Sequence, residues 1–221
     1  MKKGSPRTGV RGKVTRTNLP TEIRQDQILL AARKLFREKG YHGTSMQDIA
    51  DAVGLQKGSL YLHITSKEDL LLDIVNRAHQ DISEGLEAIY QLHLSPSEKL
   101  KQAIRHHTSF IARNREALWV LLEETRHLSP EKRKAVDTQL KRYTDIFASI
   151  IEEGMRIGEF RPLDYKIAAF SVLGMCNWLY RWYSKSGPLK PEEIADILSD
   201  IILVSLTARP DETPQPLDKR Q

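Results

Sequence analysis

The chain has 221 residues, of which 40% are hydrophobic, so it is long enough to bury one or two globular cores. It has no apolar run of the ~18 residues that a membrane span needs, and its single cysteine, Cys176, excludes an internal disulfide framework and fits a reducing cytoplasm. Residues 1–20 hold six basic residues and no acidic one, whereas residues 68–221 carry a net charge of −3 within a total of +5. This division is expected when only the N-terminal end meets a polyanion, although a basic run alone is as often a solvated tail.

The two ends of the chain differ in composition from everything between them. Residues 1–20 are rich in Gly, Ser, Thr, Pro and basic residues and are expected to form a disordered basic arm. Residues 209–221 include Pro214 and Pro216 and offer little to bury, so a disordered tail is expected there. Between the ends, apolar residues recur at spacings of three and four, and strand patterns are missing. The chain is therefore predicted to be all-α.

Two helices are predicted before residue 55. The first has apolar residues on one face and ends at a glycine: Ile28, Ala31, Ala32, Leu35, Phe36 and Gly40. Thr44 or Ser45 is predicted to cap the second, with Gln47 or Asp48 at the capping-box position. This second helix is short, because Gly54 ends it.

A third helix, between Gln56 and Ile64, is too short to carry a core of its own. A short helix, a turn built on glycine and a second short helix form a helix-turn-helix. In that arrangement the second helix buries only Leu60 and Ile64, because its outer face enters the major groove of DNA. The alternative interpretation is a small helical corner in an ordinary bundle.

The side chains of this third helix suit contact with DNA. Gln56 can bond adenine edges, Lys57 can reach guanine or phosphate, and Gly58 permits close approach. Ser59 and Tyr61 add polar groups to the same short segment.

The remaining helix starts are marked by Ser66 and by two Ser-Pro pairs, Ser95-Pro96 and Ser129-Pro130. Lys67 follows the first of these caps, where free backbone N–H groups and the helix dipole attract phosphate. The helix after Ser129-Pro130 carries a sustained inward stripe: Val136, Leu140, Tyr143, Phe147, Ile150 and Gly154.

The segment GYHGTSMQDIADAVGLQKGSLYLHITSKEDLL, residues 40–71, closely resembles the DNA-binding segment of the tetracycline-repressor (TetR) family of bacterial regulators. The resemblance implies phosphate contacts by Thr44, Tyr61, His63 and Lys67, and base contacts by Gln56, Lys57, Gly58 and Ser59. Two departures stand out. Gln56 replaces the usual Ser or Thr cap, so the recognition helix is expected to fray away from DNA, and Ile64 replaces the usual Phe, with a modest loss of packing.

The family architecture implies about nine helices in two parts. Residues 21–66 would form the three-helix DNA-binding domain, and residues 67–208 a helical domain for ligand binding and dimerisation. The implied function is a ligand-responsive repressor, not an enzyme, that binds a palindromic operator in double-stranded DNA as a dimer. The competing class is a helical carrier or enzyme whose N-terminal bundle is only structural.

Two last helices are predicted at about residues 164–184 and 191–208. Small residues in the first of them permit close helix approach: Ala168, Ala169, Ser171 and Gly174. The second has a broad apolar face: Ile194, Ile197, Leu198, Ile201, Ile202 and Ser205. By the resemblance, the two helices of each subunit would form a four-helix homodimer interface. The alternative is an internal core.

The segments GEFRPLD (158–164) and LGMCNWLYRWY resemble the branch of TetR regulators that senses acyl-CoA thioesters. That branch implies an apolar tunnel for the acyl chain and arginines for the CoA phosphates. The candidate ligand-binding residues are Phe110, Trp119, Leu122, Glu123, Arg126, Tyr143, Phe147, Trp178, Arg181 and Trp182. Aromatic residues one helical turn apart are more often core or interface packing, and a drug or free fatty acid is the alternative effector.

Nothing in the sequence predicts a cofactor or a metal site. His106 and His107 are adjacent, so they point about 100° apart on a helix and cannot easily share a metal. Cys176 lies in a very apolar helix and is interpreted as a buried small hydrophobe.

Overall fold

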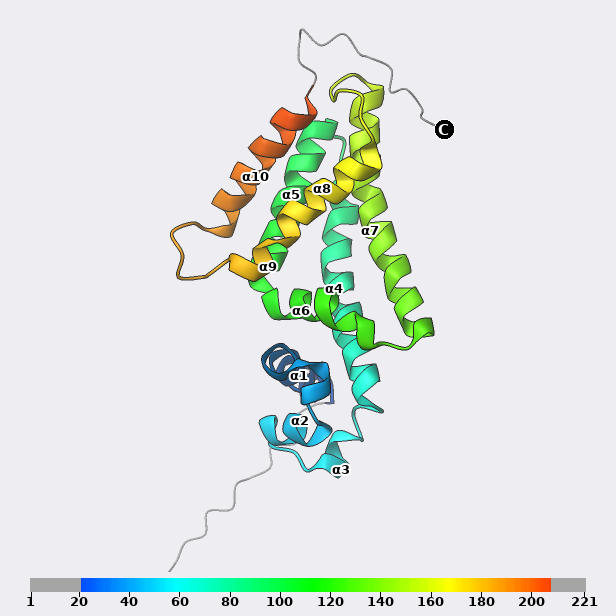
Figure 1. Cartoon of the computed structure of the whole chain (residues 1–221), viewed down its shortest axis with the longest axis vertical. Helices are drawn as coiled ribbons and strands as arrows, with labels where there is room; N and C mark the ends of the chain where they lie inside the picture. The colour runs from blue at the N-terminus through cyan, green and yellow to red at the C-terminus, as the bar shows by residue number, and fades with distance from the viewer. Residues whose placement is uncertain (1–20, 208–221) are drawn as a thin grey trace, which may run out of the picture.

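The computed structural model describes residues 21–207, and within that range the secondary structure is helical apart from one isolated bridge between Phe160 and Thr207. The all-α prediction is confirmed, whereas the predicted arm and tail lie outside the described residues. The helices are α1 (Thr21–Gly43), α2 (Met46–Ala52), α3 (Lys57–Leu60), α4 (Lys67–Tyr90), α5 (Pro96–Arg113), α6 (Arg115–Trp119), η1 (Val120–Glu124), η2 (Thr125–His127), α7 (Pro130–Arg156), α8 (Tyr165–Asn177), α9 (Leu179–Trp182) and α10 (Pro191–Leu206). In Figure 1, α1 to α3 form the lower end, and α4 rises from them into a bundle with α5, α7, α8 and α10. None of the described helices is long and apolar enough to cross a membrane.

Local sequence explains how the first three helices start and stop. Gly40 has φ 74°, a left-handed conformation that interrupts α1 one turn before its last residues. The Ser45 hydroxyl accepts the Asp48 N–H at 3.1 Å, and the Asp48 carboxylate accepts the Ser45 N–H at 2.8 Å, so these two residues form the capping box of α2. Gly54, with φ 67°, turns the chain toward α3. Both predicted glycine stops are confirmed.

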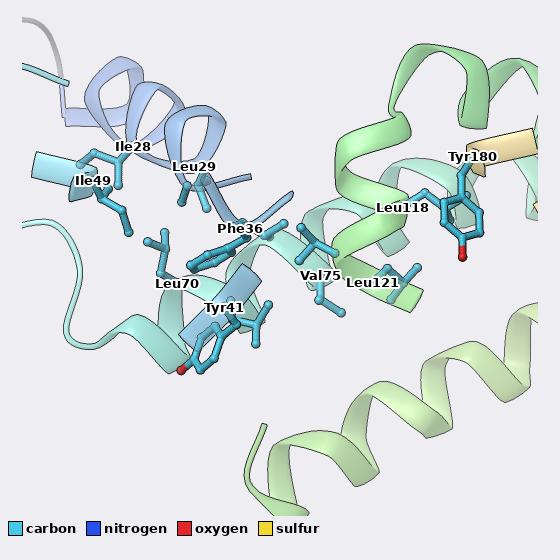
Figure 2. Packing of buried hydrophobic residues seen from close by; sticks show 14 of the residues in the cluster. Ile28, Leu29, Phe36, Tyr41, Ile49, Leu70, Val75, Leu118, Leu121 and Tyr180 are labelled. Carbon is cyan, nitrogen blue, oxygen red and sulfur yellow. The ribbon is translucent and has the colours of Figure 1, made fainter. Parts of the chain in front are cut away.

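Two buried apolar clusters form the core. The first lies under α1 and includes Phe36 and Leu70, together with Leu118 and Tyr180 from the regulatory half (Figure 2). The second lies among α4, α5, α7, α8 and α10 and includes Phe147. The boundary proposed between residues 66 and 67 falls at the start of α4, and the first core continues across it. Movement in the regulatory half is therefore coupled by packing to the DNA-binding half.

Two parts of the helical prediction need correction. The single helix predicted over residues 164–184 is broken, because α8 ends at Asn177 and α9 is only a four-residue helix. Between α5 and α7 the chain forms α6, the π-helical turn η1 and the 3₁₀ turn η2, none of which was predicted. The stripe on α7 is confirmed, with five of its six members buried and Leu140 half-buried.

Candidate DNA-binding surface and regulatory core

The segment from Gln56 to Ile64 buries its apolar side and exposes its polar side. Leu60 is completely buried and Ile64 nearly so, as predicted. Gln56, Lys57 and Gly58 are exposed on the other side. A Cβ added at Gly58 would meet no atom within 4 Å, so this side of α3 is open to close approach. The Gln56 side chain makes no cap hydrogen bond, as expected from its departure from the family pattern.

The turn after α3 presents a further exposed group. Tyr61 is 46% exposed, and Leu62, which the sequence analysis did not consider, is 83% exposed. Such exposure of a leucine between two polar residues suits contact with a thymine methyl or a sugar. Ser59 and His63 are half-buried, and His63 Nδ1 is buried without a hydrogen-bond partner. A phosphate contact by His63 would therefore use Nε2.

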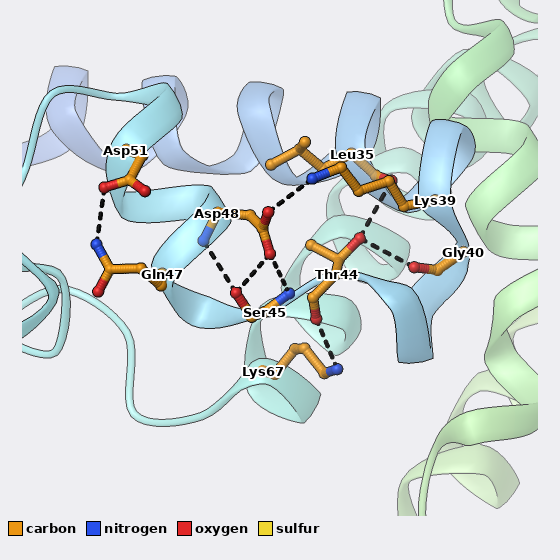
Figure 3. Close-up of polar contacts among 9 residues, drawn as sticks. All are labelled: Leu35, Lys39, Gly40, Thr44, Ser45, Gln47, Asp48, Asp51 and Lys67. Atoms are coloured by element: carbon orange, nitrogen blue, oxygen red, sulfur yellow. Dashed lines mark hydrogen bonds and ion pairs between the residues drawn. The ribbon is translucent and has the colours of Figure 1, made fainter.

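The Thr44 side chain, in the loop between α1 and α2, binds back to α1, and Lys67 binds the loop itself through the Thr44 carbonyl (Figure 3). The Thr44 hydroxyl, with its single proton, lies within hydrogen-bond distance of two carbonyl oxygens, that of Gly40 at 2.9 Å and that of Leu35 at 3.1 Å. Lys67 Nζ donates to the carbonyls of Tyr41 at 2.9 Å and Thr44 at 2.8 Å, and lies 4.4 Å from the centre of the Tyr41 ring. These bonds satisfy carbonyls that the end of α1 leaves open.

Thr44 and Lys67 therefore differ in whether their side chains can reach a phosphate. Thr44 is 1% exposed, which contradicts the predicted phosphate contact by its side chain; it positions the helix-turn-helix instead. Lys67 is half-buried, and burial lowers the pKa of its ammonium group. Two of its three N–H donors are used inside the protein. Its phosphate contact stays a prediction that rests on the third donor.

The first turn of α4 is tied to the regulatory half as well. The Glu68 carboxylate accepts the Ser129 N–H at 2.7 Å, and Lys132 Nζ lies 3.2 Å from Glu68 and 2.5 Å from Asp69. Lys132 holds the pKa of the Asp69 carboxyl below its usual value through a hydrogen bond. These contacts therefore connect the start of α4 to the start of α7.

A second connection runs through η2. The His127 ring stacks on Tyr41 with 5.3 Å between centroids, and it meets the edge of His42 at 4.3 Å. His127 Nε2 lies 3.1 Å from the Glu124 carboxylate, which is buried. Burial lowers the pKa of His127, and the neighbouring His42 lowers it further. Sequence reasoning missed this contact, because the two histidines are 85 positions apart.

The ten candidate ligand-binding residues are divided between the core and the surface. Three are buried in the second core and one packs against the first: Phe110, Tyr143, Phe147 and Trp119. Five are exposed: Leu122, Arg126, Trp178, Arg181 and Trp182. Their role in ligand binding stays a prediction. The break between α8 and α9 explains much of the difference, because Trp178 and Trp182 are 61% and 51% exposed.

The tenth candidate, Glu123, forms a polar cluster with Tyr180 and Arg181. The Tyr180 hydroxyl donates to Glu123 Oε1 at 2.6 Å, and Arg181 lies 3.0 Å from the same oxygen. Burial and the Glu123 carboxylate raise the pKa of Tyr180. Arg181 is thus paired with a carboxylate in this structure, and a CoA phosphate would have to compete with Glu123 for it.

Helices α8 and α10 carry large apolar side chains that are exposed to solvent. These residues form an exposed apolar face and stand at helical spacings on the two helices: Ile167, Phe170, Trp178, Ile197, Ile201 and Val204. Ser171 and Gly174, predicted to permit close approach, are exposed on the α8 part of this face. A contiguous face of this kind is typical of a protein–protein interface.

A buried polar cluster lies inside the second core. His107 contacts the Tyr143 hydroxyl at 2.8 Å and Asn177 Oδ1 at 3.0 Å. Burial lowers the pKa of His107 to about 4, so the ring is neutral at pH 7. Sequence reasoning considered His107 only as a metal ligand, although its spacing from Ile104 and Ile111 places it on the inward face of α5. Among residues 21–207 no group of three or more His, Cys, Asp or Glu side chains could hold a metal ion.

Comparison with known proteins matches both halves of the chain. Residues 28–74 match the family model described as bacterial regulatory proteins, tetR family, and residues 93–206 match the model of the tetracyclin repressor-like C-terminal domain. The transcriptional repressor KstR2 of Mycolicibacterium smegmatis is 30% identical over 83% of this chain and 91% of its own. The fatty acid metabolism regulator protein of Bacillus subtilis is 30% identical over 67% of this chain and 77% of its own.

A solved structure agrees with these matches. AibR, crystallised in complex with isovaleryl coenzyme A and operator DNA, superposes with a TM-score of 0.75 at 35% identity. The superposition covers 80% of this chain and 97% of AibR. Together with the helix-turn-helix geometry, these matches show that the chain belongs to the TetR family of DNA-binding transcriptional regulators.

Proposed function

We propose that the protein is a homodimeric repressor that binds a palindromic operator and is released by an acyl-CoA thioester. The observation that carries the DNA-binding part is the polar outer side of α3, where Gln56, Lys57 and Gly58 are exposed beside the buried Leu60. Phosphates would be contacted by Tyr61, by Nε2 of His63, and by the third donor of Lys67. Such contacts position the protein, whereas the side chains of α3 read base edges.

The exposed apolar face of α8 and α10 supports the dimer. Phe170 and Val204 are 62% and 73% exposed, and a second copy of the same face would cover them. A two-fold symmetric pairing presents the same patch from both subunits. The two α3 helices of such a dimer would read half-sites about one DNA turn apart, roughly 34–36 Å.

Two kinds of observation support an acyl-CoA effector. The relatives include a fatty acid metabolism regulator and a protein crystallised with isovaleryl coenzyme A. In this chain, the second core lies among α4, α5, α7, α8 and α10 and consists of apolar side chains around the polar cluster of His107. An acyl chain would be buried there. Arg126 and Arg181 are the exposed cations beside Leu122 and Trp178 that could take CoA phosphates.

The contacts of α4 suggest how the effector would act. Filling the core would displace α7, and Lys132 would carry that displacement to Glu68 and Asp69 at the start of α4. Lys67, in the same turn, would pull on the loop before α2. An effector shifts the equilibrium only if it binds the DNA-incompetent state more tightly, with a typical coupling of about 1–3 kcal/mol.

The DNA-binding part is tested by fluorescence anisotropy with fragments of the protein's own promoter region over a series of KCl concentrations. We expect tighter binding to a palindromic fragment than to random DNA, and an affinity that falls linearly with salt on logarithmic axes. Gln56→Ala should relax the preference at one position of each half-site, whereas the control Gln91→Ala, after the end of α4, should change nothing. Absence of binding at low salt, or equal affinity for random DNA, would favour a helical carrier or enzyme.

The effector part is tested by release of operator DNA with an acyl-CoA series and with the matching free acids. Release by acyl-CoA alone supports the proposal. Equal release by both series would favour the alternative of a CoA-free hydrophobic effector, such as a drug or fatty acid. Release by neither would contradict both versions while leaving the DNA-binding result intact.

A further inference from the structure

The buried cluster around His107 contains a polar group with no adequate partner. Thr108, next to His107 on α5, is completely buried. Its hydroxyl makes no hydrogen bond within the described residues, and the nearby Cys176 thiol is only a weak hydrogen-bonding group. A hydroxyl left unpaired in an apolar core costs stability, so its presence among Phe147, Leu173 and other apolar side chains requires an explanation.

The hydrogen bonds of His107 define which atoms donate. Asn177 Oδ1 can only accept, so the proton of the neutral ring is on Nε2, 3.0 Å away. Nδ1 then accepts from the Tyr143 hydroxyl at 2.8 Å. If the Asn177 amide turns over, its NH₂ group donates to Nε2, Nδ1–H donates to the Tyr143 oxygen, and the Tyr143 O–H is freed. The cluster can therefore free the Tyr143 hydroxyl as a donor, and Thr108 supplies a second buried hydroxyl in the same core.

The cluster carries no charge. Thr108, Tyr143 and Asn177 are neutral side chains, and burial keeps His107 neutral at pH 7. A carboxylate brought here would lack a counter-ion, and an unpaired buried charge is far more costly than a neutral carbonyl that receives hydrogen bonds. The electrostatics thus favour an uncharged acceptor.

Space for an apolar chain adjoins the cluster. A hollow of about 340 Å³ lies between α7 and α8; Leu140, Thr144, Ala148 and Phe170 line it, and the charged residues Asp137, Lys141, Asp145 and Lys166 complete the lining. Leu140 and Thr144 flank Tyr143 along α7, and the cluster joins the same two helices through Tyr143 and Asn177. Separation of α7 from α8 would connect the hollow with the cluster.

We infer that Thr108 and Tyr143 recognise an uncharged carbonyl oxygen of an apolar effector, as in a thioester or ketone, and that a free carboxylate is rejected. His107 and Asn177 are positioning residues that orient the Tyr143 hydroxyl. The inference rests on the proposed effector-controlled function but does not require coenzyme A, because it concerns only the buried end of the effector.

The test compares probes that differ only in the carbonyl. Binding to the full chain is measured by calorimetry for acyl-CoA thioesters from butyryl to dodecanoyl, for the matching alkyl-CoA thioethers, for methyl ketones with the matching alkanes, and for the free acids. A hydrogen bond to a buried donor is expected to make carbonyl probes bind about tenfold or more tightly than their carbonyl-free partners. The free acids should bind more weakly than the thioesters or ketones.

Variants then assign the preference to particular hydroxyls. Thr108→Val and Tyr143→Phe should each reduce the ratio of carbonyl to carbonyl-free affinity toward one, while Thr108→Ser should retain it. Phe147→Leu, in the same core, is the control: it should change the affinity of both probes alike. Melting temperatures of each variant establish that it is folded.

The outcomes separate the inference from the proposed function. A ratio that the hydroxyl variants leave unchanged, tightest binding by the free acids, or no carbonyl preference in either probe series overturns the inference, even if acyl-CoA still releases operator DNA. Carbonyl preference in the ketone series alone supports the inference and contradicts the acyl-CoA effector.

Discussion

Lys67→Met should both destabilise the protein and remove one phosphate contact, because the ammonium group of Lys67 has two donors bound inside the protein and a third directed to DNA in the proposed function. The methionine keeps the apolar stem but removes an ammonium group that donates to the carbonyls of Tyr41 and Thr44 at 2.9 and 2.8 Å. Hydrogen bonds from a charged group contribute about 1.5–3 kcal/mol each, and a cation over an aromatic ring adds about 0.5–1 kcal/mol. Since Lys67 is half-exposed and water can replace part of this bonding, we expect a loss of about 2–3 kcal/mol in the free energy of unfolding.

Urea denaturation measures this loss, and a salt titration of operator binding separates the two roles of Lys67. Each phosphate contact contributes roughly 0.9 to the slope of log affinity against log salt concentration. The matched control is Lys57→Met on the exposed side of α3. It should leave the unfolding free energy within about 0.5 kcal/mol of the parent, as surface substitutions usually do. For Lys67→Met we expect lower stability and weaker binding to all DNA sequences alike, with the slope reduced by about 0.9 because the proposed phosphate contact of the third donor is also lost. Full stability combined with a slope reduced by about 0.9 would refute the positioning role.

Three further predictions concern the core, its titration and the dimer. Gly154→Ala would place a Cβ 2.2 Å from the Phe160 ring, so urea denaturation should show a free energy of unfolding about 1–3 kcal/mol lower. The control Gly58→Ala, whose Cβ would meet no atom within 4 Å, should leave the free energy of unfolding nearly unchanged. Equal stabilities of the two variants would contradict the tight packing at Gly154. His107 has a pKa of about 4 in the folded state against 6.5 in the unfolded state, so the unfolded state binds more protons between these pH values. The free energy of unfolding should therefore fall by about 3 kcal/mol as the pH drops from 6.5 to 4. His107→Gln should remove this part of the pH dependence, and an identical pH profile for the variant would contradict the role of His107. Val204→Lys on α10 should yield monomers in analytical ultracentrifugation while the control Leu92→Lys stays dimeric, and a dimeric Val204 variant would exclude that face as the interface.

The DNA-binding half was predictable because its sequence rules are local. The hydroxyl and carboxylate of Ser45 and Asp48 are three residues apart, and Gly54 alone decides where α2 ends, so a short window contains the information. Leu60 and Ile64 are the only apolar residues that the short segment needs to bury. The residue pattern alone could not reveal that Thr44 turns inward, because that depends on how the chain folds back on α1 after Gly40.

The regulatory half was predictable as helices but not as a site. Periodicity identifies the inward face of α7, yet it cannot distinguish a side chain that lines a cavity from one that fills the core, as Tyr143 and Phe147 do. The break after Asn177 follows no glycine or proline, so an apolar run looked like one continuous helix. The partners of His107, which lies on α5, come from two other helices, α7 and α8, and only the packed structure brings them together.

The number of residues in the π-helical turn Val120–Glu124 determines which way the following residues point, and so whether His127 meets the DNA-binding half. A π turn accommodates one residue more than an α turn between the ends of its hydrogen bond. Deleting one residue here would leave a regular α-helix, but everything after it would rotate by about 100°. His127 would then face away from Tyr41, although every residue of both elements was still present. A single insertion or deletion in this turn would therefore separate the regulatory half from the DNA-binding half without removing any of the side chains that join them.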